Sequence, residues 1–194
     1  LKTGATTLAH KIERAAGRAV DGLLARDYLA PVIQRRFPQA KVNTLASFRG
    51  EETLFVNARV CGSGWTPPAD RLAHWHGDTL ACWRTAADVT AIQDYAALCA
   101  AAGRADRADF TGEWFDYIWD AMLANPAQIA ADFAAEGRKG IEGSMHDSAV
   151  IFGPQDQLFV GAGAEIHPFV CVDTRNGPVT IEAGCEIHPY TRIE

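Results

Sequence analysis

The chain has 194 residues, of which 48% are hydrophobic, and its formal net charge is −6. A mildly acidic chain without a basic stripe lacks the electrostatic footprint of a nucleic-acid-binding protein, and no apolar run is long enough to span a membrane. No signal-peptide pattern opens the sequence, and the five cysteines stand singly, without the spacing of a zinc site or a disulfide framework. We therefore expect a cytoplasmic protein with reduced thiols, no nucleic-acid partner and no membrane contact.

Helix-like and strand-like segments alternate along the first two thirds of the chain. Residues 6–17 have apolar side chains at helical spacing, with a Thr cap before them and Gly at the end. Residues 27–37 predict a second helix with a buried stripe made of Leu29, Val32, Ile33 and Phe37. Three segments favour strands, namely 41–45, 53–57 and 79–83. The second of these is mostly apolar and is expected in the interior of a sheet.

Three more helices are predicted before the sequence changes character. Asp88 is the expected cap of the first, which carries Ile92, Tyr95 and Cys99 on one face. Residues 114–122 predict the next helix. Asn125 is the expected cap of the last, which has Pro at its first position and ends at Gly137. Helices that alternate with apolar strands indicate an α/β domain with a mainly parallel sheet.

Aliphatic residues recur at every sixth position near the carboxyl end. They form two runs, Val160, Ile166 and Val172 and then Ile181, Ile187 and Ile193. Small or β-branched residues stand four positions after most of them. This spacing fits neither an amphipathic helix nor a hairpin but is typical of a hexapeptide β-helix, whose flat sides enclose the aliphatic side chains. One coil cannot bury its own interior, so neighbouring coils are expected to stack.

Three extra residues separate the two runs and predict a short loop at 173–179, where Asn-Gly-Pro provides turn chemistry. Because of this loop, His167 and His188 fall at equivalent places on successive coils, and each precedes a Pro. We expect the two imidazoles to stack along one edge.

The polar, Gly-rich segment 137–143 separates the two patterns, so we place one domain at 1–143 and a second at 144–194. The chain begins at Leu1 without an initiator Met and stops at Glu194 directly after an interior aliphatic. A β-helix that ended there would leave an uncovered edge, which natural chains usually protect. We therefore expect the first domain to lack its amino-terminal part and the second to lack further coils.

Several segments together resemble a sugar nucleotidyltransferase family. They are 1–13, 26–31, 54–59, 117–120 and 177–179. The family is similar to the bifunctional bacterial N-acetylglucosamine-1-phosphate uridyltransferase/glucosamine-1-phosphate acetyltransferase. The resemblance runs along nearly the whole chain. It implies an incomplete Rossmann-like nucleotidyltransferase domain, followed by the start of a left-handed parallel β-helix of hexapeptide repeats that associates as a homotrimer.

The resemblance also implies a reaction. A sugar-1-phosphate oxygen attacks the α-phosphorus of a nucleoside triphosphate, which forms a nucleotide sugar of the UDP-N-acetylglucosamine type and releases pyrophosphate. This chemistry needs amides and basic side chains around the phosphates, and Mg²⁺ to offset developing charge. In the family, a strand and loop that would precede Leu1 supply much of this. The catalytic residues therefore stay unassigned, and a piece without that segment can be inactive.

Four residues are candidates for binding the nucleotide or the sugar phosphate. Gly4 matches the family glycine near the first helix, where a bare backbone can approach a ligand, although a turn glycine looks the same. Asn57 stands at a strand's carboxyl end, where α/β sheets bind ligands. Arg59 stands nearest to the place of a metal-holding Asp in relatives; arginine cannot ligate Mg²⁺ but can clamp a phosphate. Lys2 is the fourth candidate. Asp27 is interpreted as a helix cap.

Histidines provide two further hypotheses. His74 and His76 would share one face of a strand, as a metal site requires, but no third ligand is evident. His167 and His188 are candidate bases of an acyltransferase that uses acetyl-CoA, and corner geometry at His-Pro is the simpler explanation. Two alternatives to nucleotidyl transfer therefore stay open. One is an acetyl- or acyltransferase with its site in the β-helix, and the other is a non-catalytic protein whose β-helix only trimerises.

Overall fold

The computed structural model describes every residue from Leu1 to Glu194. The chain divides into two compact units. The first consists of Leu1 and Thr7–Ile118, and the second of Lys2–Thr6 and Trp119–Glu194. None of the helices has both the length and the apolar character needed to cross a lipid bilayer.

Helix α1 (Leu8–Ala16) opens the first unit, and both of its ends follow the predicted signals. The Thr7 hydroxyl accepts a hydrogen bond from the His10 N–H at 3.2 Å. Gly17 ends the helix with a φ of 67°, a left-handed backbone that favours glycine. The prediction of a helix at 6–17 is confirmed.

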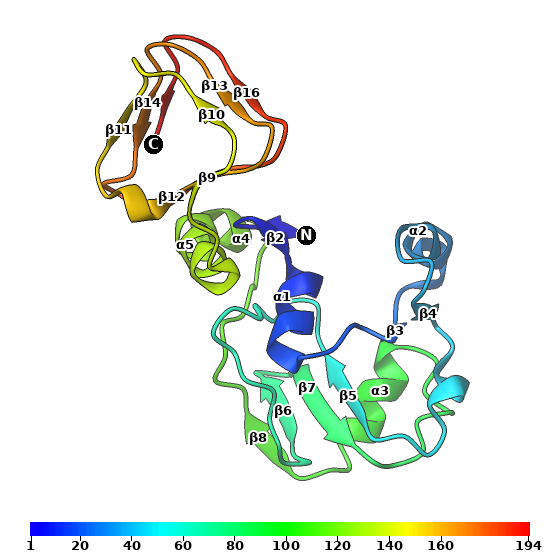
Figure 1. Cartoon of the computed structure of the whole chain (residues 1–194). Helices are drawn as coiled ribbons and strands as arrows, with labels where there is room; N and C mark the ends of the chain where they lie inside the picture. Colours follow the sequence, from blue (N-terminus) through cyan, green and yellow to red (C-terminus); the bar gives the residue numbers. More distant parts are fainter. The chain divides into compact units, whose positions relative to one another are not determined.

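A four-stranded sheet in the order β5-β7-β6-β8 forms the centre of this unit (Figure 1). Its strands are β5 (Thr53–Val56), β6 (Ala73–His76), β7 (Thr79–Thr85) and β8 (Arg107–Asp109). Strand β7 runs antiparallel to both β5 and β6, and only β6 and β8 are parallel. The fold is mixed α/β, but the expectation of a mainly parallel sheet is wrong for these strands. The reason is local, since the tight turn at Gly77 and Asp78 joins β6 directly to β7, and tight turns make antiparallel neighbours.

The best-buried strand of this sheet is β7, not the segment expected in its interior. Strand β5 lies at the edge, and its four residues are only half-buried. The core instead gathers around β6, β7 and α3 (Tyr95–Ala102). Its two largest members are Trp75 and Trp83. The apolar sequence of 53–57 therefore predicted a strand correctly but did not predict its position at the edge of the sheet.

Helix α3 begins later than expected. Its cap is Asp94, which has an extended backbone and accepts a hydrogen bond from the Ala97 N–H at 2.7 Å. Asp88 caps a separate turn, where it accepts from the Thr90 N–H at 2.9 Å. Two Asp residues can each end a turn, and only the longer apolar segment after Asp94 continues as a helix.

Residues 27–37 form the 3-10 turn η1 (Asp27–Leu29) and helix α2 (Ala30–Arg36). The buried stripe predicted here is wrong, because Val32 is 65% exposed and Leu29 and Phe37 are also exposed. Helix α2 contacts mainly η1 and strand β4 (Lys41–Val42), which leaves its apolar face without a cover. Strand β4 pairs in parallel with β3 (Gly22–Leu23), and η2 (Leu45–Phe48) follows it.

The second unit begins with strand β1 (Lys2–Thr3), which pairs with β2 (Thr6–Thr7), and continues with α4 (Asp120–Leu123) and α5 (Asn125–Glu136). Of the helix predicted at 114–122, only the last part is helical, as α4. Trp114 instead forms an isolated antiparallel β-bridge with Val60. Helix α5 is confirmed, with Pro126 in its first turn and Gly137 at its end. Its cap is Ala124 rather than Asn125.

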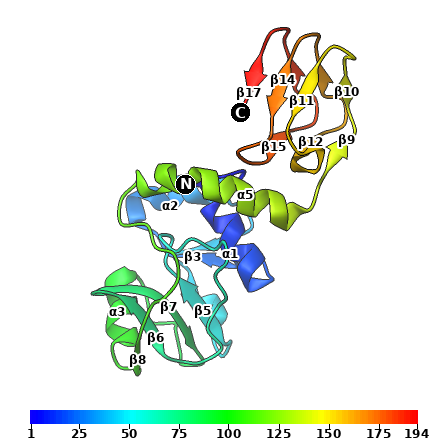
Figure 2. The same cartoon turned by 90° about the vertical axis from the view of Figure 1, so that its left-hand side faces the viewer.

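Three three-stranded parallel sheets make up the rest of this unit and outline the sides of a triangle (Figure 1). Figure 2 shows one of these sheets from the side, with β11, β14 and β17 next to one another. The first contains β9 (Gly140–Ile141), β12 (Leu158–Val160) and β15 (Val179–Ile181). The second contains β10 (Ser144–Met145), β13 (Glu165–Ile166) and β16 (Glu186–Ile187). The third contains β11 (Val150–Phe152), β14 (Cys171–Asp173) and β17 (Arg192–Ile193), and the short turn η3 (Gln155–Gln157) precedes β12. The first parallel strand thus begins before the boundary expected at residue 144.

The aliphatic residues at six-residue spacing face one another inside these sheets. Val160, Ile166 and Val172 are almost completely buried, as is Ile181. Each pairs with or packs on the residue twenty-one positions away, as in the register of Val160 with Ile181 and of Val172 with Ile193. The prediction that these side chains form one shared interior is confirmed.

A buried carboxylate joins two coils of this unit. Asp173 on β14 accepts hydrogen bonds from Arg175 at 2.7 and 2.9 Å, and from Arg192 of the next coil at 2.7 Å. The hydrogen bonds from Arg175 and the positive charges of both guanidinium groups lower the pKa of Asp173 to about 2. Asp173 therefore stays ionised over the ordinary pH range and links β14 to β17.

Candidate functional site

A pocket of the first unit lies where the parallel strands β3 and β4 end. Asn43 follows β4 directly, and its backbone N–H donates to the Leu23 carbonyl at 2.9 Å. Its side chain bridges to Ala25, accepting from the N–H at 2.8 Å and donating to the carbonyl at 2.9 Å. The same amide donates to Asp27 at 3.3 Å. Asn43 therefore holds the two strand ends together, at the kind of edge where α/β sheets bind ligands.

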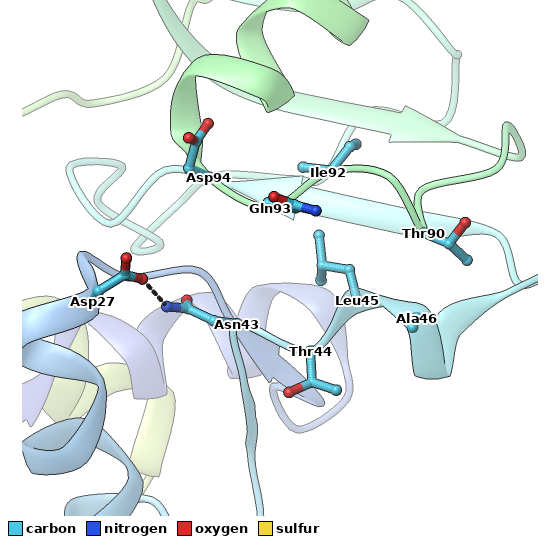
Figure 3. Close-up of a pocket in the computed structure, with 9 residues that line it drawn as sticks. All are labelled: Asp27, Asn43, Thr44, Leu45, Ala46, Thr90, Ile92, Gln93 and Asp94. Carbon is cyan, nitrogen blue, oxygen red and sulfur yellow. Dashed lines mark hydrogen bonds between the residues drawn. The ribbon is translucent and has the colours of Figure 1, made fainter.

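This pocket has a volume of about 460 Å³ and a lining that is more polar than apolar (Figure 3). Leu45 and Ile92, both buried members of the core, are its two large apolar residues. The other residues that line it are Asp27, Asn43, Thr44, Ala46, Thr90, Gln93 and Asp94. The amides, hydroxyls and carboxylates of this lining suit the polar groups of a ligand.

The charged groups of the pocket are two carboxylates, on Asp27 and Asp94. No Lys or Arg lines it, so a phosphate that entered alone would meet two like charges. Carboxylate, amide and hydroxyl oxygens are the ligands that Mg²⁺ prefers. Asp27 and Asp94 supply the carboxylates of this pocket, at separate places on its lining (Figure 3).

Asn57 and Arg59 lie elsewhere in the first unit and are engaged in local contacts. The Asn57 side chain donates to the Leu80 carbonyl at 3.0 Å and accepts from the Arg59 N–H at 3.0 Å. Arg59 donates through Nε to the Phe115 carbonyl and through Nη2 to the Asp116 carboxylate at 2.9 Å. Its guanidinium also lies over the Trp114 ring at 4.8 Å. Both residues thus tie the end of β5 to neighbouring segments.

Lys2 and Gly4 belong to the second unit, where Gly4 makes a close approach to α5. The Gly4 N–H donates to the Asn125 side chain at 2.7 Å, and its φ is 69°. A Cβ at this position would lie 2.7 Å from the Asp132 carboxylate and from the Gln128 backbone. The glycine is required by this packing whether or not a ligand is present. Lys2 is exposed on β1.

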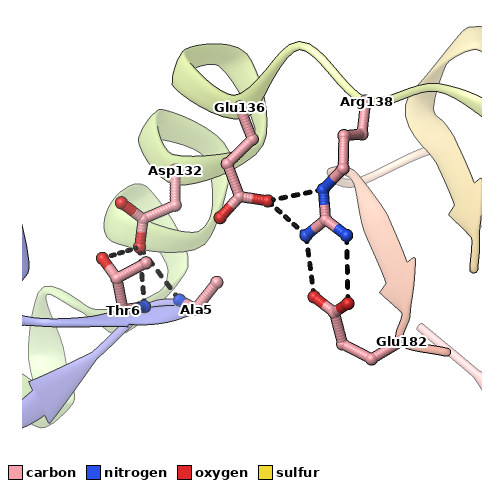
Figure 4. A network of polar contacts seen from close by, with 6 residues as sticks. All are labelled: Ala5, Thr6, Asp132, Glu136, Arg138 and Glu182. Atoms are coloured by element: carbon pink, nitrogen blue, oxygen red, sulfur yellow. Dashed lines mark hydrogen bonds and ion pairs between the residues drawn. The ribbon is translucent and has the colours of Figure 1, made fainter.

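Asp132 is the centre of this packing (Figure 4). It is completely buried and accepts hydrogen bonds from the Ala5 N–H at 3.0 Å and from both the N–H and the hydroxyl of Thr6 at 3.1 Å. Further along the same unit, Arg138 forms a two-pronged ion pair with Glu182 and also binds Glu136. The hydrogen bonds from Arg138 lower the pKa of Glu182. Together the contacts of Arg138 connect the end of α5 to the residue that follows β15.

His74 and His76 bind different partners. His74 lies 2.9 Å from the Asp70 carboxylate, and this hydrogen bond lowers the pKa of Asp70. His76 stacks on the Trp114 ring at 5.0 Å. The register shift between His74 and Trp75 interrupts the alternation of the strand. His74 also lines a second cavity of about 320 Å³ with Cys82, whose pKa burial raises to about 12, so that its thiol stays protonated.

His167 and His188 lie next to each other, as the twenty-one-residue spacing predicts. Their ring centres are 5.6 Å apart in an edge-on arrangement. Glu186 lies between them, 3.2 Å from His167 Nε2 and 3.9 Å from His188 Nδ1. The acidic neighbour was not among the residues selected from the sequence.

Sequence reasoning also missed the main pocket. Asn43 carries the same signal that selected Asn57, because a polar residue follows a predicted strand in both cases. Asp27 was interpreted as a helix cap, and the structure places it as the first residue of η1 and on the rim of the pocket. No sequence pattern marked Gln93 or Asp94 as pocket residues. Their position in the pocket lining depends on how the segment after β7 folds back.

Comparison with known proteins gives one finding at the level of families. The family model described as sugar nucleotidyl transferase matches residues 1–139. No curated protein matches the chain. The matched range contains the pocket at the ends of β3 and β4 and stops just before β9.

Proposed function

The chain belongs to the sugar nucleotidyl transferase family, and on this premise we propose that it joins a nucleoside triphosphate to a sugar-1-phosphate and releases pyrophosphate. The product is a nucleotide sugar of the UDP-N-acetylglucosamine type. The observation that carries the proposal is the pocket at the carboxyl ends of β3 and β4, which lies inside the matched range. Its lining is mostly polar and includes Asp27, whose carboxylate accepts a hydrogen bond from the Asn43 amide.

The pocket residues would bind and orient the sugar and the base. Leu45 and Ile92 are the large apolar residues that such a ligand would meet there. Gln93 and Thr90 offer hydrogen-bond donors and acceptors to hydroxyl or amide groups. Because Asn43 is fixed by three hydrogen bonds, its orientation is set before a ligand arrives, which reduces the entropic cost of binding.

Asp27 and Asp94 would hold Mg²⁺, which supplies compensation for negative charge on phosphate oxygens when it is bound. Asp94 is held in place as the cap of α3. Asp27 is oriented by the Asn43 amide. Both carboxylates are therefore positioned by the protein before any ion binds.

In the first unit, Arg59 is the basic residue that we propose for a phosphate contact, at a place apart from the pocket. In the second unit, Lys2 is a separate candidate for such a contact. Arg59 uses Nε and Nη2 within the protein, and its Nη1 group remains for an oxygen ligand. Asn57 supports this arrangement through the Arg59 N–H. The Gly4 N–H already donates to Asn125, so a phosphate at Gly4 would have to compete with that hydrogen bond.

The test of the pocket is the substitution Asp27→Ala. We expect it to weaken binding of UTP with Mg²⁺, measured by calorimetry, at least about tenfold, because a metal ligand is lost. Pyrophosphate release should fall by a similar factor. Removing Mg²⁺ with EDTA should weaken binding to the unaltered chain by at least the same factor, because no Lys or Arg lines the pocket.

The matched control is Asp21→Ala, which removes an equal charge from an exposed residue that pairs with Arg18 outside the pocket. This variant should bind UTP as the unaltered chain does. Equal binding by both variants, or binding that does not need Mg²⁺, would show that the pocket is not the nucleotide site.

We further propose that the sugar nucleotidyltransferase part ends near residue 143, and that the parallel sheets of the second unit, which begin with β9, form a left-handed hexapeptide β-helix that assembles a homotrimer. The shared aliphatic interior supports this proposal. Light scattering should give the mass of three 21.0 kDa chains. A monomer at micromolar concentration would contradict the trimer.

A further inference from the structure

Three histidines lie in a row along one edge of the parallel sheets. The register pairs Met145 with Ile166 and Ile166 with Ile187, so the residue after each falls at an equivalent place on successive coils. These following residues are His146, His167 and His188. The backbone confirms the alignment, since the His146 N–H donates to the Ile166 carbonyl and the His167 N–H to the Ile187 carbonyl.

Glu186, His167 and His188 form a group of three possible metal ligands whose ligand atoms lie close together. One of its oxygens lies 3.2 Å from His167 Nε2 and 3.9 Å from His188 Nδ1. One ligand atom from each residue lies within 4.8 Å of the other two. We propose that His167, Glu186 and His188 bind a divalent transition-metal ion of the Zn²⁺ class.

The distances are close to those that a bound ion would require. Ligand atoms at 2.0–2.1 Å around a tetrahedral Zn²⁺ lie about 3.3 Å apart. The closest pair already has this separation, and the widest must shorten by about 1.5 Å, a movement within reach of exposed side-chain rotations. Only His167 is mostly covered, with 30% of its side chain exposed, while Glu186 and His188 are 55% and 73% exposed.

The chemistry of the three ligands selects the ion. Two neutral imidazoles and one carboxylate suit Zn²⁺ and related ions, whereas Mg²⁺ prefers oxygen ligands. The three ligands offset one of the two positive charges. A fourth position stays open to water or to an oxygen ligand, as in sites that keep three protein ligands. Without an ion, the same groups would form only a weak exposed ion pair.

His146 stands in the same row but has a different local partner. Its Nδ1 atom lies 2.9 Å from the Ser148 hydroxyl and accepts from the Ser148 N–H at 3.2 Å. Ser144 occupies the place on its coil that Glu165 and Glu186 occupy on the next two. Because it lacks an acidic partner and lies outside the group of three possible metal ligands, His146 provides a matched control within the row.

The test is calorimetric titration of the whole metal-free chain with ZnCl₂. We expect one tight Zn²⁺ per chain, and a weakening of at least about tenfold for both Glu186→Gln and His188→Ala. His146→Ala should bind as the unaltered chain does. Addition of Co²⁺ should give the visible absorption of a tetrahedral site.

Several outcomes would overturn the assignment. They are the absence of Zn²⁺ binding, binding that is unchanged in His188→Ala, and an equal loss in His146→Ala. Circular dichroism should show that the variants are folded, which is expected for exposed side chains. Acetyl-CoA binding that requires His167, in a chain that does not bind Zn²⁺, would instead assign this edge to acyl transfer.

Discussion

Replacing Asp132 with alanine is expected to lower the free energy of unfolding of the second unit by about 3 kcal/mol. The carboxylate is completely buried and accepts three hydrogen bonds from Ala5 and Thr6. Its removal leaves two backbone N–H groups without this partner, and hydrogen bonds to a charged group contribute about 1.5–3 kcal/mol each. Urea denaturation followed by circular dichroism measures the loss.

Two further variants make this measurement specific. Asp156→Ala removes an exposed carboxylate that lies 3.9 Å from Lys139, and it should change stability by less than about 0.5 kcal/mol. Asp132→Asn keeps one acceptor oxygen and should lose less than Asp132→Ala. If Asp132→Ala were as stable as Asp156→Ala, the segment Lys2–Thr6 would not be held to α5 in the way described.

Replacing Gly62 with alanine should destabilise the first unit by about 3 kcal/mol or more. A Cβ there would lie 2.4 Å from the carbonyl carbon of Lys11 and 2.6 Å from the Ile12 nitrogen. Backbone atoms of a helix cannot move aside as a flexible side chain can, so the strain of overpacking is not relieved. The neighbours Val60 and Cys61 are completely buried, which prevents the loop from shifting outward.

The control for this change is Gly64→Ala, two residues further along. Its φ is 70° and no atom lies within 4 Å of the added Cβ, so only backbone strain of about 1–2 kcal/mol is expected. Tryptophan fluorescence during urea denaturation reports on this unit, which contains Trp65, Trp75, Trp83 and Trp114. An equal loss in both variants would contradict the close approach of residue 62 to α1.

Sequence patterns gave reliable predictions where the deciding contacts are local or strictly periodic. The Thr7 cap and the closing Gly17 of α1 depend on residues within one helical turn. The six-residue spacing predicted the buried interior of Val160, Ile166 and Val172 because every coil repeats the same environment. The same repeat placed His167 beside His188.

Sequence patterns gave wrong predictions where two residues have the same local signal and only one of them takes the predicted role. Asp88 and Asp94 both have the chemistry of a helix cap, and the longer apolar segment after Asp94 decides between them. The stripe on α2 has the right period but no element packs on it, so Val32 stays exposed. Periodicity states which face is apolar and cannot state whether another element covers that face.

The sequence by itself determined the mixed α/β character of the first unit, the buried aliphatic interior of the second and the resemblance to a family that the match over 1–139 supports. Only the tertiary structure decided the strand order, the pocket around Asn43 and the position of Glu186 between two histidines. Helix caps and repeats are set by short-range sterics and hydrogen bonds. A pocket is set by which distant segments meet, as those of Asp27 and Asp94 do around one pocket, and that depends on the free energy of the whole packed unit.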